Sequence, residues 1–331
     1  MRFLIKLIFL VVLVISTLAG GFWWWANQPL ALRNTPLDFR VINGSSLRSA
    51  INQMREAGVS VQPSLLELLA KINKAETGIK AGSYSINQGI TPMGLIDKLL
   101  QGKVSLGQTT LIEGWTLRQW RAKLDNNPEL IHLTRGLSEQ ELAQRLGLAT
   151  PSVEGWLFPD TYLFDKQSND LDVLARSVRV MQSKVESEWA SRAENLPYKN
   201  LYDALIMASI IEKETGREAD RSLVAAVFVN RLRRGMLLQT DPSVIYGLGE
   251  NFDGNLRKRD LQMDTPYNTY TRSGLPPTPI AMPGLNSLRA ALHPANSDAL
   301  YFVARGDGSS EFSRTLDEHN RAVNKYIRGR K

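Results

Sequence analysis

The segment that decides the fold is LYDALIMASIIEKETG, residues 201–216. Its part Leu205–Ile211 carries no charge and runs directly into Glu-Lys-Glu at 212–214. Apolar side chains fall on most sides of a helix built from this segment, so the sequence predicts a helix buried at the centre of a domain. Gly216 is a typical helix terminator, which would place both glutamates in the last turn.

The two glutamates at this helix end differ in direction. At 100° per residue, Glu212 and Glu214 point about 160° apart, so one cavity cannot hold both unless the helix breaks between them. Burial and the negative end of the helix dipole both raise the pKa of a carboxyl group here, as a general acid near neutral pH requires. The alternative is an ordinary solvated helix end, with Lys213 and Arg217 as screening neighbours. These residues alone leave both interpretations open.

Composition limits the classes of function. The chain has 331 residues, of which 43% are hydrophobic and 22% charged, so we expect two or three folded domains. The net charge of +7 suits an anionic partner, but no strip of basic and aromatic residues indicates nucleic-acid binding. The absence of cysteine excludes disulfides and a thiol nucleophile. The three histidines, His132, His293 and His319, lack ligand spacing, so neither a metal nor another cofactor is expected.

The N-terminus carries an uncharged run over residues 7–25, LIFLVVLVISTLAGGFWWW. At ~1.5 Å per residue, such a helix spans about 28 Å, close to the hydrocarbon thickness of a bilayer. Arg2 and Lys6 precede the run and favour a cytoplasmic N-terminus, while Trp23–Trp25 follow it, where interfacial aromatics belong. The sequence predicts an uncleaved anchor, with the rest of the chain outside the cytoplasm. A cleaved signal peptide is the alternative.

A strand–turn–helix pattern recurs three times after the anchor, beginning at Asp38, Ser83 and Thr109. Each unit has a short alternating strand, a glycine-containing turn and an amphipathic helix. A hydroxyl residue stands at each predicted N-cap, where it accepts a backbone N–H bond: Ser46, Thr91 and Thr116. Such units build small α+β modules, which serve as structural spacers or bind glycans.

The C-terminal region mixes helices with turn-rich segments. Residues 235–284 are rich in glycine, proline and tyrosine. Their aromatic and amide side chains suit a carbohydrate cleft, although a rigid loop packed by its prolines is equally compatible. The other expected elements are a helix-rich stretch at 138–146, an aromatic turn at 155–164, helices at 171–190, 220–234 and 317–328, and a strand at 300–304.

Several blocks of this sequence closely resemble the YceG-like family, whose members are endolytic murein transglycosylases. The blocks are ASIIEKET (208–215), EGWLFPDTY (154–162), FVNRLRRGMLLQTDPSVIYGLG (228–249), YNTYTRSGLPPTPIAMPG (267–284) and ALHPA (291–295). The resemblance covers nearly the whole chain, and it implies an α+β protein with an N-terminal transmembrane helix. The implied domains are a cytoplasmic tip and anchor (1–27), a linker (28–37), a LysM-like module (38–107) and a larger mixed α+β catalytic domain (108–331).

The resemblance also implies the reaction and its catalyst. Family members cleave MurNAc–GlcNAc β-1,4 bonds within peptidoglycan strands and leave 1,6-anhydroMurNAc ends, with one glutamate as acid and then base. That residue corresponds to Glu214, and neither metal nor cofactor is needed. The matching blocks suggest substrate-binding roles for seven further residues: Glu212, Asn230, Gln239, Asp241, Tyr267, Asn268 and Tyr270.

The implied setting is the bacterial inner membrane, crossed once, with the N-terminus cytoplasmic and the catalytic domain periplasmic. The expected partners are peptidoglycan glycan strands, the membrane itself and peptidoglycan synthases, but not nucleic acid. Two other functions remain open. One is a peptidoglycan hydrolase that pairs Glu214 with Asp241 or Glu212, and the other is a non-catalytic, membrane-anchored glycan-binding scaffold.

Overall fold

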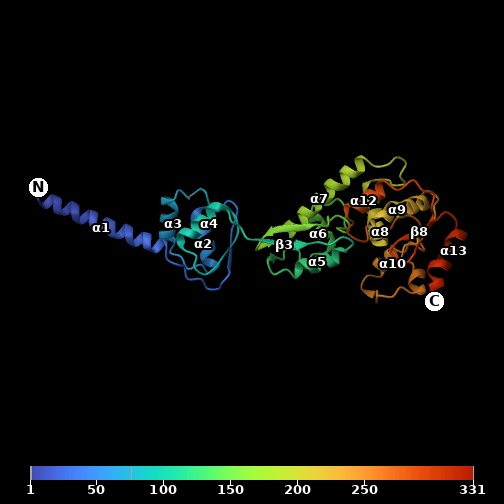
Figure 1. Cartoon of the computed structure of the whole chain (residues 1–331), viewed down its shortest axis with the longest axis horizontal. Helices are drawn as coiled ribbons and strands as arrows, with labels where there is room; N and C mark the ends of the chain where they lie inside the picture. Colours follow the sequence, from blue (N-terminus) through green and yellow to red (C-terminus); the bar gives the residue numbers. More distant parts are fainter. Residues whose placement is uncertain (1, 76, 331) are drawn as a thin grey trace. The chain divides into compact units, whose positions relative to one another are not determined.

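The computed structural model describes residues 2–75 and 77–330, which divide into two units (Figure 1). The first unit contains the chain up to Gln108 together with two short later segments, Glu129–Ile131 and Leu163–Ser168. The second unit contains the remainder. The architecture is mixed α+β, as expected from the sequence, and its strands form four two-stranded sheets among the described residues.

The first helix, α1 (Arg2–Ala26), is long and apolar enough to cross a membrane, with a mean hydropathy of 2.6. A signal sequence near the N-terminus can meet the same criteria of length and hydropathy. Trp23 and Trp24 are exposed, as residues of an interfacial belt would be. Phe22 and Trp25, by contrast, pack against the core of the first unit, with ring centroids 5.6 Å apart. The last turn of α1 therefore belongs to the folded module.

The module after α1 has two antiparallel strands, with Phe39 paired to Tyr84 and their rings stacked. Ser46 and Thr91 cap their helices as predicted, by accepting the backbone N–H groups three residues later. The sequence reasoning missed α3 because its N-cap residue makes no side-chain cap bond. The elements are β1 (Leu37–Val41), α2 (Leu47–Glu56), α3 (Pro63–Ile72), β2 (Gly82–Ile86) and α4 (Pro92–Gln101).

The third strand–turn–helix unit does not continue the first two. Its strand β3 (Leu106–Thr110) pairs with β5 (Thr161–Asp165), which comes from a distant part of the sequence. Its helix α5 (Leu117–Asp125) begins with the predicted Thr116 cap, which forms a complete capping box with Gln119. The remaining short pair joins β4 (Leu130–Ile131) to β6 (Ser168–Asn169).

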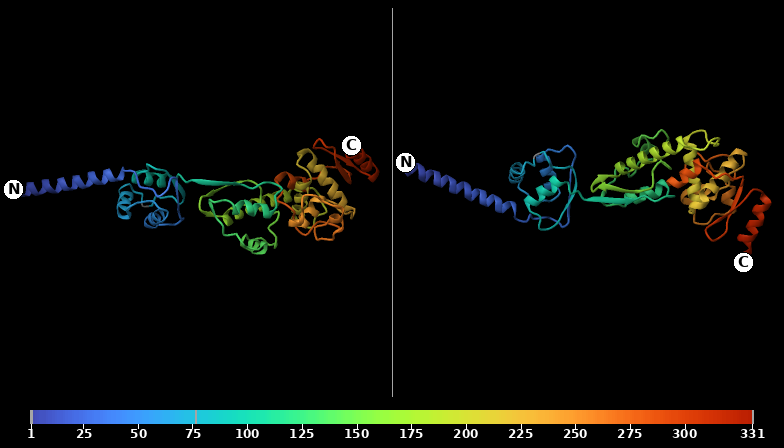
Figure 2. Two further views of the ribbon diagram at one scale, coloured as in Figure 1. Left: turned by 90° about the horizontal axis from the view of Figure 1, so that it is seen from below. Right: turned by 45° about the horizontal axis from the view of Figure 1, so that its top comes forward.

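The second unit is built mainly of helices. Figure 2 shows its C-terminal part, where the antiparallel pair β7–β8 and helix α13, in red, lie together at one edge. The segment 235–284 is not one continuous helix, as its many turn residues predicted, and it contains two short α-helices between its turns. The elements are α6 (Glu139–Arg145), α7 (Asp170–Ala190), α8 (Leu201–Glu214), α9 (Glu218–Arg233), α10 (Asp241–Leu248), α11 (Lys258–Gln262), α12 (Leu285–Leu292), β7 (Tyr301–Ala304), β8 (Ser310–Ser313), α13 (Leu316–Tyr326) and the 3₁₀ turns Gly249–Asn251 and Arg328–Arg330.

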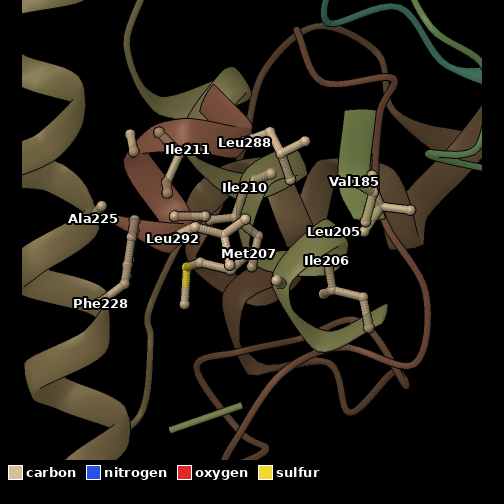
Figure 3. Packing of buried hydrophobic residues seen from close by; sticks show 14 of the residues in the cluster. Val185, Leu205, Ile206, Met207, Ile210, Ile211, Ala225, Phe228, Leu288 and Leu292 are labelled. Atoms are coloured by element: carbon tan, nitrogen blue, oxygen red, sulfur yellow. The ribbon is translucent and has the colours of Figure 1, made fainter. Parts of the chain in front are cut away.

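Helix α8 lies at the centre of the second unit, which confirms the prediction from its sequence. All eight residues of 204–211 are buried, and α7, α9 and α12 pack around them. Figure 3 shows Met207 and Ile210 of α8 among Phe228 of α9 and Leu292 of α12. Each such side chain contributes about 1.5–3 kcal/mol through burial. Because α8 is held in this core, the position of its last turn, which carries Glu212 and Glu214, is fixed within the second unit.

Helix α8 ends two residues before Gly216, the terminator named from the sequence. Thr215 is already extended, with φ −146° and ψ 131°, so the helix ends at Glu214 rather than at Gly216. Both glutamates nevertheless lie in the last turn, as predicted.

Substitution of Gly155 by alanine is expected to destabilise the second unit by about 2–3 kcal/mol. Gly155 has φ +81°, and an added Cβ would lie 2.5 Å from Cγ of Pro279, in the proline-rich segment 275–279. Gly136→Ala is a matched control because Gly136 also has φ +81° but open space around the added atom. Thermal unfolding should show the larger loss for Gly155→Ala. Equal losses would mean that Pro279 contributes nothing.

Candidate functional site

The carboxyl group of Glu214 is hydrogen-bonded by the hydroxyl of Thr240, which donates to Oε1. Thr240 is itself held in place, since its N–H donates to Oγ1 of Thr269 at 3.0 Å and its carbonyl accepts from the Ser243 hydroxyl at 2.9 Å. Thr240, Ser243 and Thr269 are all buried. A rigid polar group therefore faces one oxygen of Glu214, and the other oxygen has no partner among these hydroxyls.

The surroundings of Glu214 raise its pKa to about 7. Burial is the largest cause, and the charge of nearby Asp241 adds to it. The Thr240 hydrogen bond and the charge of Arg231 act in the opposite direction, but they are outweighed. A carboxyl group with such a pKa can donate a proton near neutral pH and take one back.

Asp241 and Tyr270 meet beside this glutamate. The Tyr270 hydroxyl donates to Oδ1 of Asp241 at 2.6 Å, and burial raises the pKa of Tyr270. Asp241 is exposed at the start of α10, directly after Thr240. The structure thus brings together three of the residues that the sequence analysis singled out, Glu214, Asp241 and Tyr270.

Substitution of Asp241 by asparagine is expected to lower the pKa of Glu214, because a negative charge that raises it is removed. Activity that needs protonated Glu214 declines as pH rises through that pKa, so the alkaline limb of the pH–rate profile should move down by about 0.5–1 unit. Asp264→Asn is the control, since Asp264 is an exposed aspartate paired with Arg272 at 2.7 Å. An unmoved or upward-shifted limb would show that the charge of Asp241 does not raise the pKa of Glu214. Complete loss of activity would instead make Asp241 a second catalytic carboxyl.

Gln239 lies next to this group in a strained backbone conformation, with φ +51°. Its N–H donates to the Thr269 carbonyl at 3.0 Å, and its side-chain oxygen accepts from Nη1 of Arg231 at 3.4 Å. Arg231 is buried and also holds the carbonyls of Leu238 and Leu300. The segment that carries Thr240 is therefore fastened on both sides.

Two other predicted binding residues, both asparagines, hold loops instead of facing open space. Asn268 has no exposed surface, and its amide donates to the carbonyls of Leu261 and Met263. Asn230 donates in the same way to the carbonyls of Ser297 and Ala299, at 2.8 and 3.0 Å. These contacts favour supporting roles for both asparagines.

Tyr267 is also engaged within the protein. Its hydroxyl shares a 2.9 Å hydrogen bond with Thr278, and its ring packs against Tyr246 with centroids 4.9 Å apart. The ring is half-buried, so one part of it is open to a ligand.

Glu212 faces a different set of groups, as its direction on the helix predicts. Its Oε2 accepts from the Gly284 N–H at 3.0 Å, and its Oε1 lies 3.9 Å from Arg221. The nearby Glu113 carboxyl has its pKa raised by burial and by the charge of Glu212. Glu212 thus joins the end of α8 to the loop before α12, while Glu214 remains in the other cluster.

The sequence reasoning missed a buried carboxyl group at position 154. Glu154 accepts the Leu117 N–H at the start of α5 and the Tyr246 hydroxyl at 3.1 Å. Burial raises its pKa to about 8, although both hydrogen bonds oppose the shift. The available signal was its place in the block EGWLFPDTY.

One group of side chains could hold a metal ion. Ligand atoms of Asp125, His132 and Asp170 lie within 4.8 Å of one another. Asp170 already accepts hydrogen bonds from Leu133 N–H and from the Thr134 N–H and hydroxyl. These bonds account for the buried aspartate without a metal, and the wide spacing of the three residues in the sequence gave no ligand signal.

Comparison with known proteins places this site in a family. The chain matches the model of the YceG-like family over residues 39–325. It is 34% identical to an endolytic murein transglycosylase of Bacillus subtilis (strain 168), over 88% of this chain and 85% of the relative. It is 27% identical to an endolytic murein transglycosylase of Streptococcus pneumoniae serotype 2 (strain D39), over 86% of this chain and 57% of that longer relative.

A solved structure supports the same grouping. The crystal structure of a YceG-like protein from Listeria monocytogenes superposes with a TM-score of 0.56 at 30% sequence identity, and the match covers 86% of this chain and 97% of that one. The family model extends across the Glu214 cluster and over most of both units. The chain therefore belongs to the YceG-like family.

Proposed function

We infer that this protein is an endolytic murein transglycosylase, which cleaves the β-1,4 bond between MurNAc and GlcNAc within glycan strands and leaves 1,6-anhydroMurNAc ends. Relatives that cover most of the chain bear that name. The observation that carries the proposal is Glu214, a partly buried acid with a pKa of about 7 beside a buried threonine.

We propose that Glu214 works first as an acid and then as a base. The Thr240 hydroxyl donates to Oε1, so the carboxylic proton is carried on Oε2. That proton passes to the glycosidic oxygen as the bond to C1 of MurNAc breaks through an oxocarbenium-like state. The resulting carboxylate then takes the proton of the MurNAc C6 hydroxyl, whose oxygen bonds to C1. The nucleophile belongs to the substrate, and Glu214 ends protonated again.

The residues around Glu214 would bind the strand on either side of the bond. Asp241, Tyr270 and the exposed part of Tyr267 offer hydroxyl-binding and ring-stacking groups. We propose these three, with Gln239, as substrate-binding residues. Glu212, Asn230 and Asn268 would act by holding the site together, through the contacts described above.

A two-carboxylate hydrolase is the second candidate, because Asp241 lies close enough to Glu214 to raise its pKa. Mass spectrometry of purified strands incubated with the full-length protein in detergent distinguishes the two reactions. Transglycosylation gives anhydro ends, whereas hydrolysis gives reducing ends that are heavier by one water. Reducing ends as the main product would overturn the transglycosylase, and uncleaved strands would favour the scaffold.

We further propose that α1 is an uncleaved anchor in the bacterial inner membrane, with both units in the periplasm. Arg2 and Lys6 before the apolar run support this orientation. The residues 38–107 would form a LysM-like module that contacts glycan, and residues 108–331 the catalytic domain. Peptidoglycan synthases are the protein partners that the family suggests. A reporter active only outside the cytoplasm, fused after the last residue, should be active, and inactivity would refute this orientation.

A further inference from the structure

A cavity of about 830 Å³ lies within the second unit, beside the Glu214 cluster but lined by other residues. One wall is α5, including Arg118, and another is α10 with Tyr246. Its volume lies within the range of ligand-binding sites in proteins, about 300–1,000 Å³. The proposed mechanism uses none of the residues that line it.

The cavity adjoins the cleavage site at two points in the chain. Lys213 lines the cavity, and the next residue is Glu214. Pro242 lines it too, and the preceding residue is Asp241. A ligand in the cavity can therefore be part of the same molecule whose glycosidic bond lies at Glu214.

The walls of the cavity carry charges of both signs. Positive side chains come from Arg118, Arg121 and Lys213, and carboxyl groups from Asp125, Glu139, Glu154 and Glu250. A glycan strand without stems offers hydroxyl and acetamido groups and the lactyl carboxylate of MurNAc, which call for positive charge at most. A short peptide with free carboxylates and an amine calls for both signs.

Several of these charges are free to change partner. Arg118 and Glu250 form an ion pair of 3.1 Å in which both side chains are mostly exposed, so the pair is weak and easily exchanged. The ammonium group of Lys213 is exposed and donates to the Gly114 carbonyl at 3.1 Å. Cations held this loosely can turn to a carboxylate of a ligand.

The inner end of the cavity, by contrast, is fixed. Glu154 ties the start of α5 to Tyr246 of α10 through the hydrogen bonds described above. The Tyr246 ring also packs on Tyr267. The two walls are thus held apart at a set distance, and the space between them persists.

We infer that this cavity binds the peptide stem of the MurNAc residue at the cleavage site, with Lys213 and Arg118 contacting stem carboxylates. The inference rests on the proposed function, since the stem is attached to the sugar whose bond Glu214 cleaves. The enzyme should therefore prefer stem-bearing strands over strands from which an amidase has removed the peptides.

The test compares both kinds of strand with wild type and the double variant Lys213→Gln, Arg118→Gln. Loss of charge-assisted bonds should raise KM for stem-bearing strands by roughly tenfold, with kcat little changed. KM for stem-free strands should stay the same. Arg179→Gln, at an exposed arginine of α7, is the control for a lost positive charge and should change neither.

Equal KM values of wild type for the two kinds of strand would overturn the inference, as would an equal effect of the double variant on both. Cleavage of neither strand by wild type would refute the proposed function instead. Calorimetry with a free stem tetrapeptide and the Glu214→Gln protein tests the cavity independently of catalysis. Binding that the double substitution weakens about tenfold is expected, and no binding would refute the stem site.

Discussion

Substitution of Glu214 by glutamine is expected to lower kcat for glycan cleavage by about 10³-fold or more, since one residue supplies both proton transfers. Glutamine keeps the size of the side chain, and its Oε1 can still accept the Thr240 hydroxyl. It cannot protonate the glycosidic oxygen or deprotonate the C6 hydroxyl. Quantifying anhydro ends over time with purified wild type and variant measures the loss directly.

The same variant should remain folded, and its stability should depend on pH in a defined way. The folded-state pKa of Glu214 is about 7, above its ordinary value of 4.5, so the folded protein holds this proton more tightly than the unfolded chain. That contribution is complete below pH 4.5 and is lost as pH rises towards 7. Glutamine has no proton to lose. The variant should therefore gain Tm relative to wild type between these two pH values.

Glu212→Gln is the matched control, since Glu212 lies in the same helical turn. Its contacts are the Gly284 N–H and Arg221, so its loss should affect the fold of the loop before α12 more than the chemical step. More than a tenth of wild-type kcat in Glu214→Gln would refute the assignment of the catalyst.

The local features of this fold could be predicted because they depend on neighbouring residues. The N-caps at Ser46, Thr91 and Thr116 follow from a hydroxyl placed before an amphipathic run, and all three form. The burial of α8 follows from its uncharged residues 204–211, which cover all sides of the helix. The separate surroundings of Glu212 and Glu214 follow from helical geometry alone.

The partners of these residues could not be predicted, because they come from distant parts of the chain. Thr240 lies 26 residues after Glu214, and no periodicity in either segment indicates that they meet. Glu154 and Tyr246 are 92 residues apart in the sequence. They meet because Glu154 also binds the start of α5, which lies opposite α10 across the cavity. Asn230 and Asn268 were predicted to bind substrate because the sequence does not show which backbone carbonyl groups their amides contact.

Arg231 shows the energetic weight of such distant contacts. Its guanidinium group is buried and donates to the Leu300 carbonyl at 2.7 Å and to the Leu238 carbonyl at 2.9 Å, with a weaker bond to Leu237. These bonds fasten α9 to the start of β7 and to the segment that leads into Thr240. Arg231 also lowers the pKa of Glu214 through its charge, in opposition to burial and Asp241.

Substitution of Arg231 by leucine should therefore destabilise the second unit by about 3–5 kcal/mol, because buried carbonyl groups lose their donors. At roughly 2–4 °C per kcal/mol, Tm should fall by about 10 °C. In the protein that remains folded, the alkaline limb of the pH–rate profile should move to higher pH, because loss of the positive charge raises the pKa of Glu214. This shift is opposite to the one expected for Asp241→Asn. Arg233→Leu is the control on the same helix, with one exposed bond to the Asn195 carbonyl, and should cost less than about 1 kcal/mol. Equal losses of Tm for the two variants would show that Arg231 does not hold the segment before Thr240.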